Sequence, residues 1–516
     1  MSEGVLKGRY AKLQQNRTSY LRRARAAAEV TLPYTFPPEG SDGDTPLPTP
    51  YQSVGARGVT NLAAKLLLAL LPPNDPFFKY QIDDITLDEM DEDTKGEAEA
   101  ALAKYERVIK DDIEASTIRV STNDAIIDLL VGGNALAFIP QVPDDERTQM
   151  RVFNLENYVV KRTPEGEVKQ IIILENAMPS TLDESVRSAC QCSEVEDDTK
   201  TVEIYTGITL KGDKWEVYQE INGNRVPGSE GSYNKDASPY FPLTFNRAEN
   251  EDYGRGLVEQ YLGDLISLES LSKSIVIGAA AAAKVLFFVA PNSSTKATTC
   301  TKAKSGDFVT GKAEDISTLQ LEKFNDFRVA SEMMDKIEGR LNQAFLLRGS
   351  VTRDAERVTA EEIRFMAVEL DDALGGIYSV LAQDFQIPLV TRLVVNLEKK
   401  EKLPILPDEL VKPIIVTGLD ALGRNADLLK LDQWVTGIFN LSPELANTYV
   451  KLNEYLRQRA AALSLNVDDL LKSEEEVAQA TQQAQIQDIV RTLGPEAMKQ
   501  FSAMAQSGGA QPQPQT

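Results

Sequence analysis

The stretch of this sequence whose residue types and spacing come closest to a catalytic motif is a near match to a nucleotide-binding loop. Residues 306–312 have the sequence GDFVTGK, which keeps the GxxxxGK spacing of a loop that wraps phosphate groups. The next residue is Ala313, so the hydroxyl that would hold magnesium is missing, and the flanking residues do not have the strand-then-helix pattern that such a loop needs. We therefore interpret the segment as a glycine-bounded turn, with nucleotide binding as the weaker alternative.

The residues that usually carry catalysis or hold metals are scarce. The chain has no histidine, which removes the commonest general base and metal ligand and excludes Ser–His and Cys–His nucleophile systems. The three cysteines, Cys190, Cys192 and Cys300, cannot all pair, and the first two are too close for an ordinary disulfide or zinc site, so we interpret them as free thiols. Carboxylates, lysines and tyrosines could still catalyse, but the carboxylates are scattered. We expect no catalytic site, no metal and no cofactor.

The composition constrains the partners. The 516 residues are enough for three or four structural units, or for one core with large insertions. The net charge of −23 repels nucleic acid, so any contact with DNA must be local or must be one in which tight binding is unwanted. The most apolar run, residues 275–290, contains Lys284 and is shorter than the roughly 20 residues that a membrane helix needs. It predicts a helix packed against protein, with no membrane insertion.

The periodicity predicts an α+β protein in which helices predominate. Residues 1–30 predict a basic helix, which suits either a solvated face or a contact with a partner or nucleic acid. The proline-rich residues 31–50 predict an extended arm or linker. Helices follow at 53–71 and 121–139, and between them an acidic stretch from Asp83 to Glu99 leads into another helix that ends at about Ile113. Between 150 and 245 the pattern changes to strands, with turns at Glu165-Gly166 and Asn222-Gly223.

Two long helices that flank a small polar insertion form the next part of the chain. Apolar residues at spacings of three and four, including Leu265 and Ile337, predict helices over 256–290 and 325–347. Each helix carries an apolar stripe that a lone pair cannot cover, so we expect Leu265 and Ile337 to pack against a neighbouring subunit. The insertion, 291–324, holds Lys296, Lys302, Lys304 and Lys312 and suits a docking surface or, alternatively, an ordinary solvated loop.

A short arginine-rich loop, 348–358, follows the second helix and holds Arg348, Arg353 and Arg357. Thr359 and Glu362 predict the capped start of a helix that Gly375-Gly376 and Pro388 should kink or break. Arg357 could instead brace the start of that helix. Residues 420–472 are again helical, and 473–516 contain a last helix and a low-complexity tail.

The order of these elements resembles the portal proteins, or head–tail connectors, of short-tailed bacteriophages. The resemblance extends over nearly the whole chain. It rests on the stretches YQSVGARG at 51–58, NLAAKL at 61–66, YGRG at 253–256, YLGDL at 261–265, TKA at 301–303, GDFVTG at 306–311 and ERVTAEEIR at 356–364. No single stretch is decisive, and their shared order makes the match specific.

The resemblance implies a portal-type fold and a division of the chain into named parts. These are a wing at 1–255, stem helices at 256–290 and 325–347, a clip at 291–324, a tunnel loop at 348–358, a kinked return to the wing at 359–419, a crown at 420–472, and a barrel helix with a flexible tail at 473–516.

The resemblance also implies a function without catalysis. Subunits would form a homo-oligomeric ring, a dodecamer, at one vertex of the virion capsid after assembly in the bacterial cytoplasm. Double-stranded DNA would pass through it without sequence specificity, and the arginines of 348–358 would line the channel. Its other partners would be the major capsid and scaffolding proteins, the terminase motor and tail adaptor proteins. The rivals are a capsid or scaffolding protein without a channel and an ATP-using packaging enzyme.

Overall fold

The computed structural model describes residues 6–73, 77–81, 92–141, 143, 147–189, 201–282, 286–319, 324–347, 365–366, 368–370, 372, 376–403, 414–417, 424–441, 450, 455–456 and 459. The chain divides into two compact units, Met1–Gly423 and Arg424–Thr516. Helices make up most of the regular structure and strands the rest, so the prediction of an α+β chain with helices predominating is confirmed.

The largest sheet lies where the sequence predicts strands. Its strands are β4 (Tyr158–Arg162), β5 (Val168–Ala177), β6 (Val202–Lys211), β7 (Lys214–Ile221), β8 (Asn224–Arg225) and β9 (Gly231–Asn234). The order is β4-β5-β6-β7-β8, all antiparallel, and β9 pairs with β7. Both predicted turns are confirmed, because Gly166 has a φ of 95°, and Asn222 and Gly223 have φ values of 51° and 80° between β7 and β8. Positive φ at both central residues is the conformation that an Asn-Gly hairpin turn requires.

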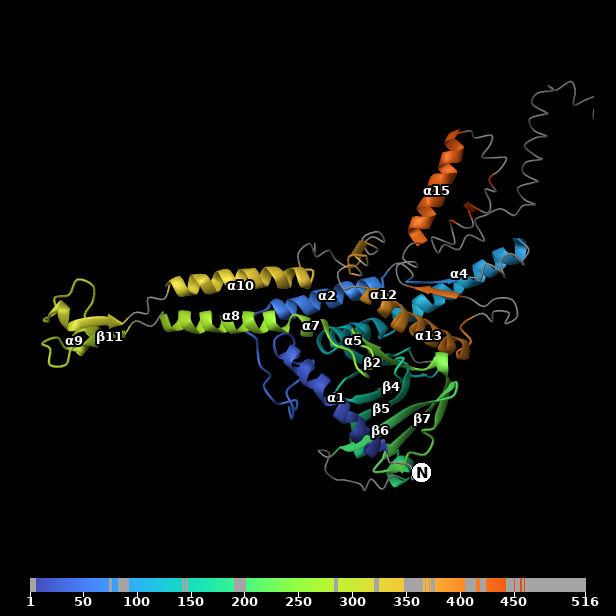
Figure 1. Ribbon diagram of the computed structural model, residues 1–516, viewed down its shortest axis with the longest axis horizontal. Helices are drawn as coiled ribbons and strands as arrows, with labels where there is room; N and C mark the ends of the chain where they lie inside the picture. The colour runs from blue at the N-terminus through green and yellow to red at the C-terminus, as the bar shows by residue number, and fades with distance from the viewer. Residues whose placement is uncertain are drawn as a thin grey trace, which may run out of the picture. The chain divides into compact units, whose positions relative to one another are not determined.

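The basic N-terminal helix, α1 (Leu6–Glu29), packs on this sheet (Figure 1). Its apolar stripe forms a small core with strand residues, made of Leu6, Tyr10, Leu13, Val159, Ile172 and Tyr205. Short helical turns η1 (Pro179–Thr181), α6 (Glu184–Ala189) and η2 (Lys235–Ala237) connect the strands.

The main core lies between helices and a smaller sheet. The helices are α2 (Val54–Leu70), α4 (Glu92–Ala115), α5 (Ile118–Gly132) and α7 (Leu257–Gln260), and the strands are β2 (Asn134–Phe138), β3 (Arg151–Asn154) and β10 (Tyr240–Thr244), in the order β10-β2-β3. The predicted helix at 121–139 is wrong beyond Gly132. Gly133 has a φ of 74°, and its Cα lies so close to the backbone of Arg255 and Gly256 that a side chain would not fit, so the helix ends there and a strand begins.

A helical segment with a π-helical turn packs against the end of α2. It consists of α12 (Ile377–Leu381), η5 (Ala382–Gln386) and α13 (Ile387–Lys399). Both predicted interruptions are confirmed, since Gly376 has a φ of 82° just before α12 and the π-helical turn directly precedes Pro388. Proline has no N–H to offer the carbonyl four residues earlier, at Asp384, and its ring crowds that carbonyl, so the wider π turn accommodates it.

Two further pairs of elements complete the first unit. Strands β1 (Phe78–Gln81) and β13 (Ile414–Thr417) form an antiparallel pair. Helices α8 (Leu262–Ala282) and α10 (Phe324–Ala344) lie side by side and carry the insertion at their far ends (Figure 1). Strand β11 (Leu286–Val289) directly precedes the insertion, which contains α9 (Ala297–Lys302), η3 (Ala313–Asp315) and β12 (Ile316–Leu319).

The sequence placed the end of the first long helix too late. The chain forms strand β11 at Leu286–Val289, paired with β12, instead of continuing a helix to residue 290. The apolar run 275–290 is therefore not one helix, because its residues 286–289, LFFV, include two aromatic residues and a β-branched valine, which favour strands. No helix among the described residues combines the length and the apolar composition that crossing a bilayer requires.

The second unit contains one long described helix, α15 (Arg424–Leu441). The expected helical part at 420–472 is thus confirmed over these residues. The expected last helix and tail at 473–516 lie outside the described residues.

Candidate functional site

The helix pair α8–α10 is held together at its base by apolar contacts and by one ion pair. Leu265 and Leu268 of α8 and Ile337 and Leu341 of α10 are buried in the main core. Arg340 donates two hydrogen bonds to Asp264, with N–O distances of 3.1 and 2.6 Å, and this contact raises the pKa of the guanidinium. The base of the pair is therefore a fixed part of the chain's own fold.

Leu265 and Ile337 lie inside the chain. Leu265 is 0% and Ile337 3% exposed in a single copy, because each packs against its own chain. Neither needs a neighbouring subunit to bury its side chain, so substitutions at these two positions test folding before they test assembly.

The far half of the same helices exposes apolar side chains. Val276 and Ile277 of α8 are each 53% exposed, and Val329 and Met333 of α10 are also exposed. Gly278 allows close approach, since a Cβ there would meet the Phe327 ring at 2.6 Å. The two helices thus touch at this level and still leave apolar surface open along their outer sides.

The insertion at the end of the pair presents its lysines to solvent. Lys296, Lys302, Lys304 and Lys312 are exposed, and none forms an ion pair with a described residue. Asp307 accepts a hydrogen bond from the backbone N–H of Lys304 at 2.6 Å, which fixes a turn rather than neutralising an ammonium group. Residues 291–313 of the insertion, in which Asp307 is the only acidic residue, therefore form a basic surface on an acidic chain.

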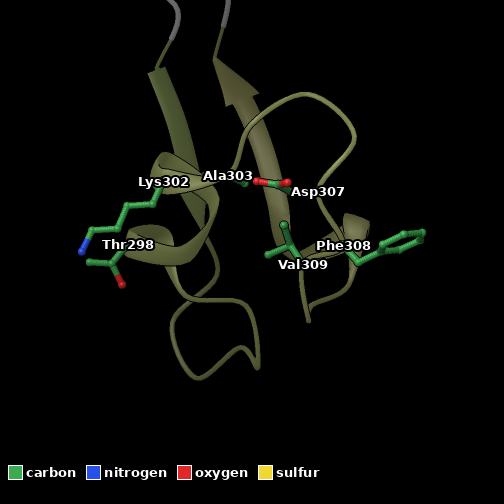
Figure 2. A pocket seen from close by; sticks show the side chains of 6 residues that line it. All are labelled: Thr298, Lys302, Ala303, Asp307, Phe308 and Val309. Atoms are coloured by element: carbon green, nitrogen blue, oxygen red, sulfur yellow. The ribbon is translucent and has the colours of Figure 1, made fainter.

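An aromatic side chain stands within this basic surface. Figure 2 shows a hollow lined by Thr298, Lys302, Ala303, Asp307, Phe308 and Val309. Phe308 points away from the rest of the insertion and is fully exposed. Exposed aromatic side chains beside charges are common at protein interfaces. The sequence indicates the lysines of this surface but does not predict that Phe308 is exposed beside them.

The segment with the GxxxxGK spacing is a turn within this insertion. Gly306 has a φ of 96°, and Gly311 lies against Thr295, where a Cβ would meet the threonine hydroxyl oxygen at 2.5 Å. The backbone N–H of Lys312 donates to the same hydroxyl at 2.9 Å, and only the short turn η3 follows. The strand and helix that a phosphate-binding loop needs on its two sides are not in place, so the interpretation as a turn is confirmed.

The end of α10 fixes where the arginine-rich loop begins. Phe345 is buried between Gly58 of α2 and Tyr261, and the carbonyls of Phe345 and Leu346 accept hydrogen bonds from Asn61 and Lys65 of α2. The expected channel residues Arg348, Arg353 and Arg357 and the capping pair Thr359 and Glu362 lie outside the described residues.

The contacts of Asn61 and Lys65 of α2 with the end of α10 were not predicted from the sequence. The signal was available, because Asn61 and Lys65 are polar residues one turn apart on a helix whose other inward-facing residues are apolar.

Comparisons with known proteins match nearly the whole chain. A family model described as "Bacteriophage head to tail connecting protein" matches residues 3–471. The portal protein of Escherichia phage T7 is 39% identical, with 99% of this chain and 98% of that protein covered, and the portal protein of Pseudomonas phage phiKMV is 33% identical over 90% and 91%. A solved structure titled as the neck of an empty GTA particle covers 80% of this chain and 90% of that chain, with 11% identity and a TM-score of 0.37.

Proposed function

The chain belongs to the family of bacteriophage head-to-tail connecting proteins, and from this premise we propose how its parts act in a portal ring at one capsid vertex. The observation that carries the proposal is the match of residues 3–471 to the family, together with relatives named as portal proteins along nearly the whole chain. We propose that the ring, a dodecamer, conducts double-stranded DNA during packaging and ejection, after assembly in the host cytoplasm.

We assign parts of the ring to segments of the chain. Residues 1–255 form the wing, with 359–419 returning to it. Helices α8 and α10 form the stem, 291–324 the clip and 348–358 the tunnel loop. Residues 420–472 form the crown, and 473–516 a barrel helix and tail. The exposed apolar side chains on the outer half of α8 and α10 support the stem assignment, since they suit contact with neighbouring copies.

The charge distribution supports a conduit over a DNA-binding protein. Each phosphate contact adds salt-dependent affinity, so a channel that holds DNA tightly would impede its movement. The chain carries a net charge of −23. The four lysines of the insertion form a cationic cluster, and none of them forms an ion pair with a described residue. The proposed function therefore needs few basic contacts with DNA, and we place them at Arg348, Arg353 and Arg357.

The partners follow from these assignments. The wing and crown would meet the major capsid and scaffolding proteins inside the shell. The clip would meet the terminase motor during packaging and the tail adaptor proteins afterwards, through Lys296, Lys302, Lys304 and Lys312. The energy for DNA packaging would come from the separate motor, which fits a portal subunit without catalysis of its own.

Electron microscopy of the purified protein tests the proposal most directly. We expect rings with a central hole. Shells, filaments or monomers would instead support a capsid or scaffolding protein without a channel. ATP hydrolysis by the pure protein would support a packaging enzyme, although the turn at 306–312 offers that enzyme no phosphate-binding loop.

The stem assignment has its own test. Ile277→Glu places a charge on the exposed outer half of α8, so we expect a folded chain that no longer forms rings on a sizing column. Leu265→Glu places a charge in the chain's own core and should lower the free energy of unfolding by several kcal/mol. Normal rings from Ile277→Glu would show that this face of α8 is not between subunits.

The tunnel loop is tested by changing Arg353 and Arg357 to Glu together. Arginine suits transient phosphate contact because its guanidinium group is always charged and carries several donors. We expect rings of normal appearance that package less DNA or lose packaged DNA. Packaging and retention at the wild-type level would show that the loop does not contact DNA. Arg357 would then be a residue that braces the next helix.

A further inference from the structure

Helix α10 ends in a turn that a leucine rarely forms. The N–H of Leu347 donates to the carbonyl of Asn342 at 2.8 Å, and the N–H of Leu346 donates to the carbonyl of Gln343 at 3.2 Å. This pair of bonds is a Schellman motif, in which the residue after the helix takes a left-handed conformation and is usually glycine. Here the residue is Leu346, with a φ of 51°. The β-carbon of leucine disfavours that conformation, so other contacts must hold it.

Those contacts come from one face of α2. Lys65 donates to the carbonyl of Leu346 at 2.9 Å, and Asn61 donates to the carbonyls of Phe345 and Leu346, each at 3.3 Å. One turn earlier, Gly58 lies against the Phe345 ring, which a Cβ would meet at 2.6 Å. Positions 58, 61 and 65 share a helix face. Three successive turns of α2 therefore hold the same two residues of the neighbouring helix end.

The use of Lys65 is unusual for a lysine. Lys65 is only 9% exposed, and its ammonium group forms no ion pair with a described residue. Burying an ammonium group is unfavourable unless it is well bonded. The carbonyls at a helix C-terminus carry partial negative charge, and a cation is stabilised there. The position of Lys65 is therefore matched to the end of α10 and to little else.

We propose that Gly58, Asn61 and Lys65 form a clamp that fixes the direction in which the chain leaves α10, and so positions the start of the arginine-rich loop in every subunit. The inference rests on the proposed function of that loop and deepens it. The clamp residues are positioning residues, since they touch the anchor at 345–346 and not DNA. Around a ring, a common starting direction would keep all copies of the loop at one level of the channel.

The test uses assembled rings of the full chain and three variants. Lys65→Met removes the ammonium group and keeps most of the side-chain length, and Asn61→Ser removes the long amide donor. Arg57→Met is the matched control, because it removes an exposed cation from the same helix without touching α10. Hydrogen exchange of the amides at 345–347 is measured together with DNA packaging and retention.

We expect normal rings from all three variants. The amides at 345–347 should exchange about tenfold faster in Lys65→Met, as the loss of one hydrogen bond predicts, and packaging should fall in the same direction as in the Arg353→Glu/Arg357→Glu variant. Arg57→Met should match wild type in both readouts. If Lys65→Met does not form rings, Asn61→Ser gives the same two readouts with a milder change.

The outcomes separate the clamp from the loop. Unchanged exchange at 345–347 would show that Lys65 does not hold the end of α10. Faster exchange with normal packaging, while the double glutamate variant packages poorly, would show that the clamp does not position the loop. If the double glutamate variant itself packages normally, the loop's proposed contact with DNA fails, and the functional part of the clamp inference fails with it.

Discussion

Two basic regions of this molecule look alike in sequence and differ in structure. Helix α1 and the insertion between α8 and α10 both concentrate cations in an acidic chain. In α1, Lys7 pairs with Glu203, Arg23 with Glu259, and Arg25 with Glu156 and Glu39. In the insertion, the four lysines form no ion pair with a described residue.

Arg17 shows how far the cations of α1 belong to the fold. It is 3% exposed, and one terminal nitrogen donates to the hydroxyl of Tyr10 and to the carbonyls of Leu155, Glu156 and Tyr158, at 2.7 to 2.9 Å. These carbonyls surround the start of β4, so Arg17 joins the helix to the edge of the sheet. Four of the seven cations of α1, namely Lys7, Arg17, Arg23 and Arg25, therefore bond within the chain's own fold, whereas the insertion lysines form no ion pair with a described residue. Arg9, Lys12 and Arg22 are exposed and form no ion pair with a described residue, so both alternatives for the basic N-terminal helix stay open for these three cations.

The largest expected effect of a single substitution is the loss of stability when Arg17 of α1 is replaced. Arg17→Met removes the donor from three buried acceptors, the Tyr10 hydroxyl and the carbonyls of Leu155 and Tyr158, so we expect the free energy of unfolding to fall by about 3 kcal/mol. The measurement is urea or thermal unfolding of the full chain. The control is Arg9→Met, which removes an exposed cation with one hydrogen bond to Gln170 and should change stability by less than about 0.5 kcal/mol. Equal stability of both variants would contradict the structural role of Arg17.

An intermediate effect is expected at the insertion, on binding and not on stability. Changing Lys296, Lys302, Lys304 and Lys312 to Ser should leave ring formation and the melting temperature unchanged. It should weaken binding of the motor or of the tail adaptor by about tenfold and reduce the salt dependence of that binding. Pull-down or surface binding with each partner measures this.

A variant of α1 with the same change in net charge is the matched control for the insertion. Lys7, Arg9, Lys12 and Arg22 changed to Ser should leave partner binding intact. If the α1 variant loses binding and the insertion variant keeps it, the two regions have exchanged roles and the comparison fails. If neither loses binding, the insertion lysines belong to an ordinary solvated loop.

Much of the fold could be predicted from the sequence because it depends on local signals. The turns at Gly166 and Asn222-Gly223 follow from residues that tolerate positive φ, and the interruption before Pro388 follows from its missing N–H. The errors arose where a distant contact decides the local structure. The end of α5 at Gly133 depends on the backbone of Arg255 and Gly256, more than 100 residues away in the sequence.

The candidate site could be predicted in type and less well in detail. Composition indicates that both regions are basic, but only the fold shows that Lys7, Arg17, Arg23 and Arg25 of α1 bond within the chain itself. The apolar stripe of α8 and α10 was found, whereas periodicity cannot tell that Leu265 and Ile337 face the chain's own core and that Ile277 and Val329 do not. Asn61 and Lys65 lie in the stretch NLAAKL, which supports the family resemblance. Their contacts with Phe345 and Leu346 could not be predicted, because those residues lie almost 300 positions away in the sequence.

The smallest effect sharpens the comparison through its pH dependence. Lys7 lies 2.6 Å from Glu203, and this hydrogen bond holds the pKa of Glu203 below its ordinary value. A carboxyl with a lowered folded-state pKa adds stability above the pKa of the unfolded chain, and that stability is lost as the pH falls through the folded-state pKa. Both side chains are partly exposed, so Lys7→Met should cost less than about 1 kcal/mol at pH 7. The difference from wild type should shrink as the pH falls below about 4.3, the ordinary pKa of glutamate.

Lys304→Met removes a cation that forms no ion pair with a described residue, so its melting curve should follow wild type at every pH between 7 and about 3.5. This range spans the ordinary pKa values of the carboxyl groups. Melting temperatures across this range measure both variants. A pH-independent cost for Lys7→Met, or a cost for Lys304→Met that disappears in acid, would show that the two regions do not differ in how their cations are used.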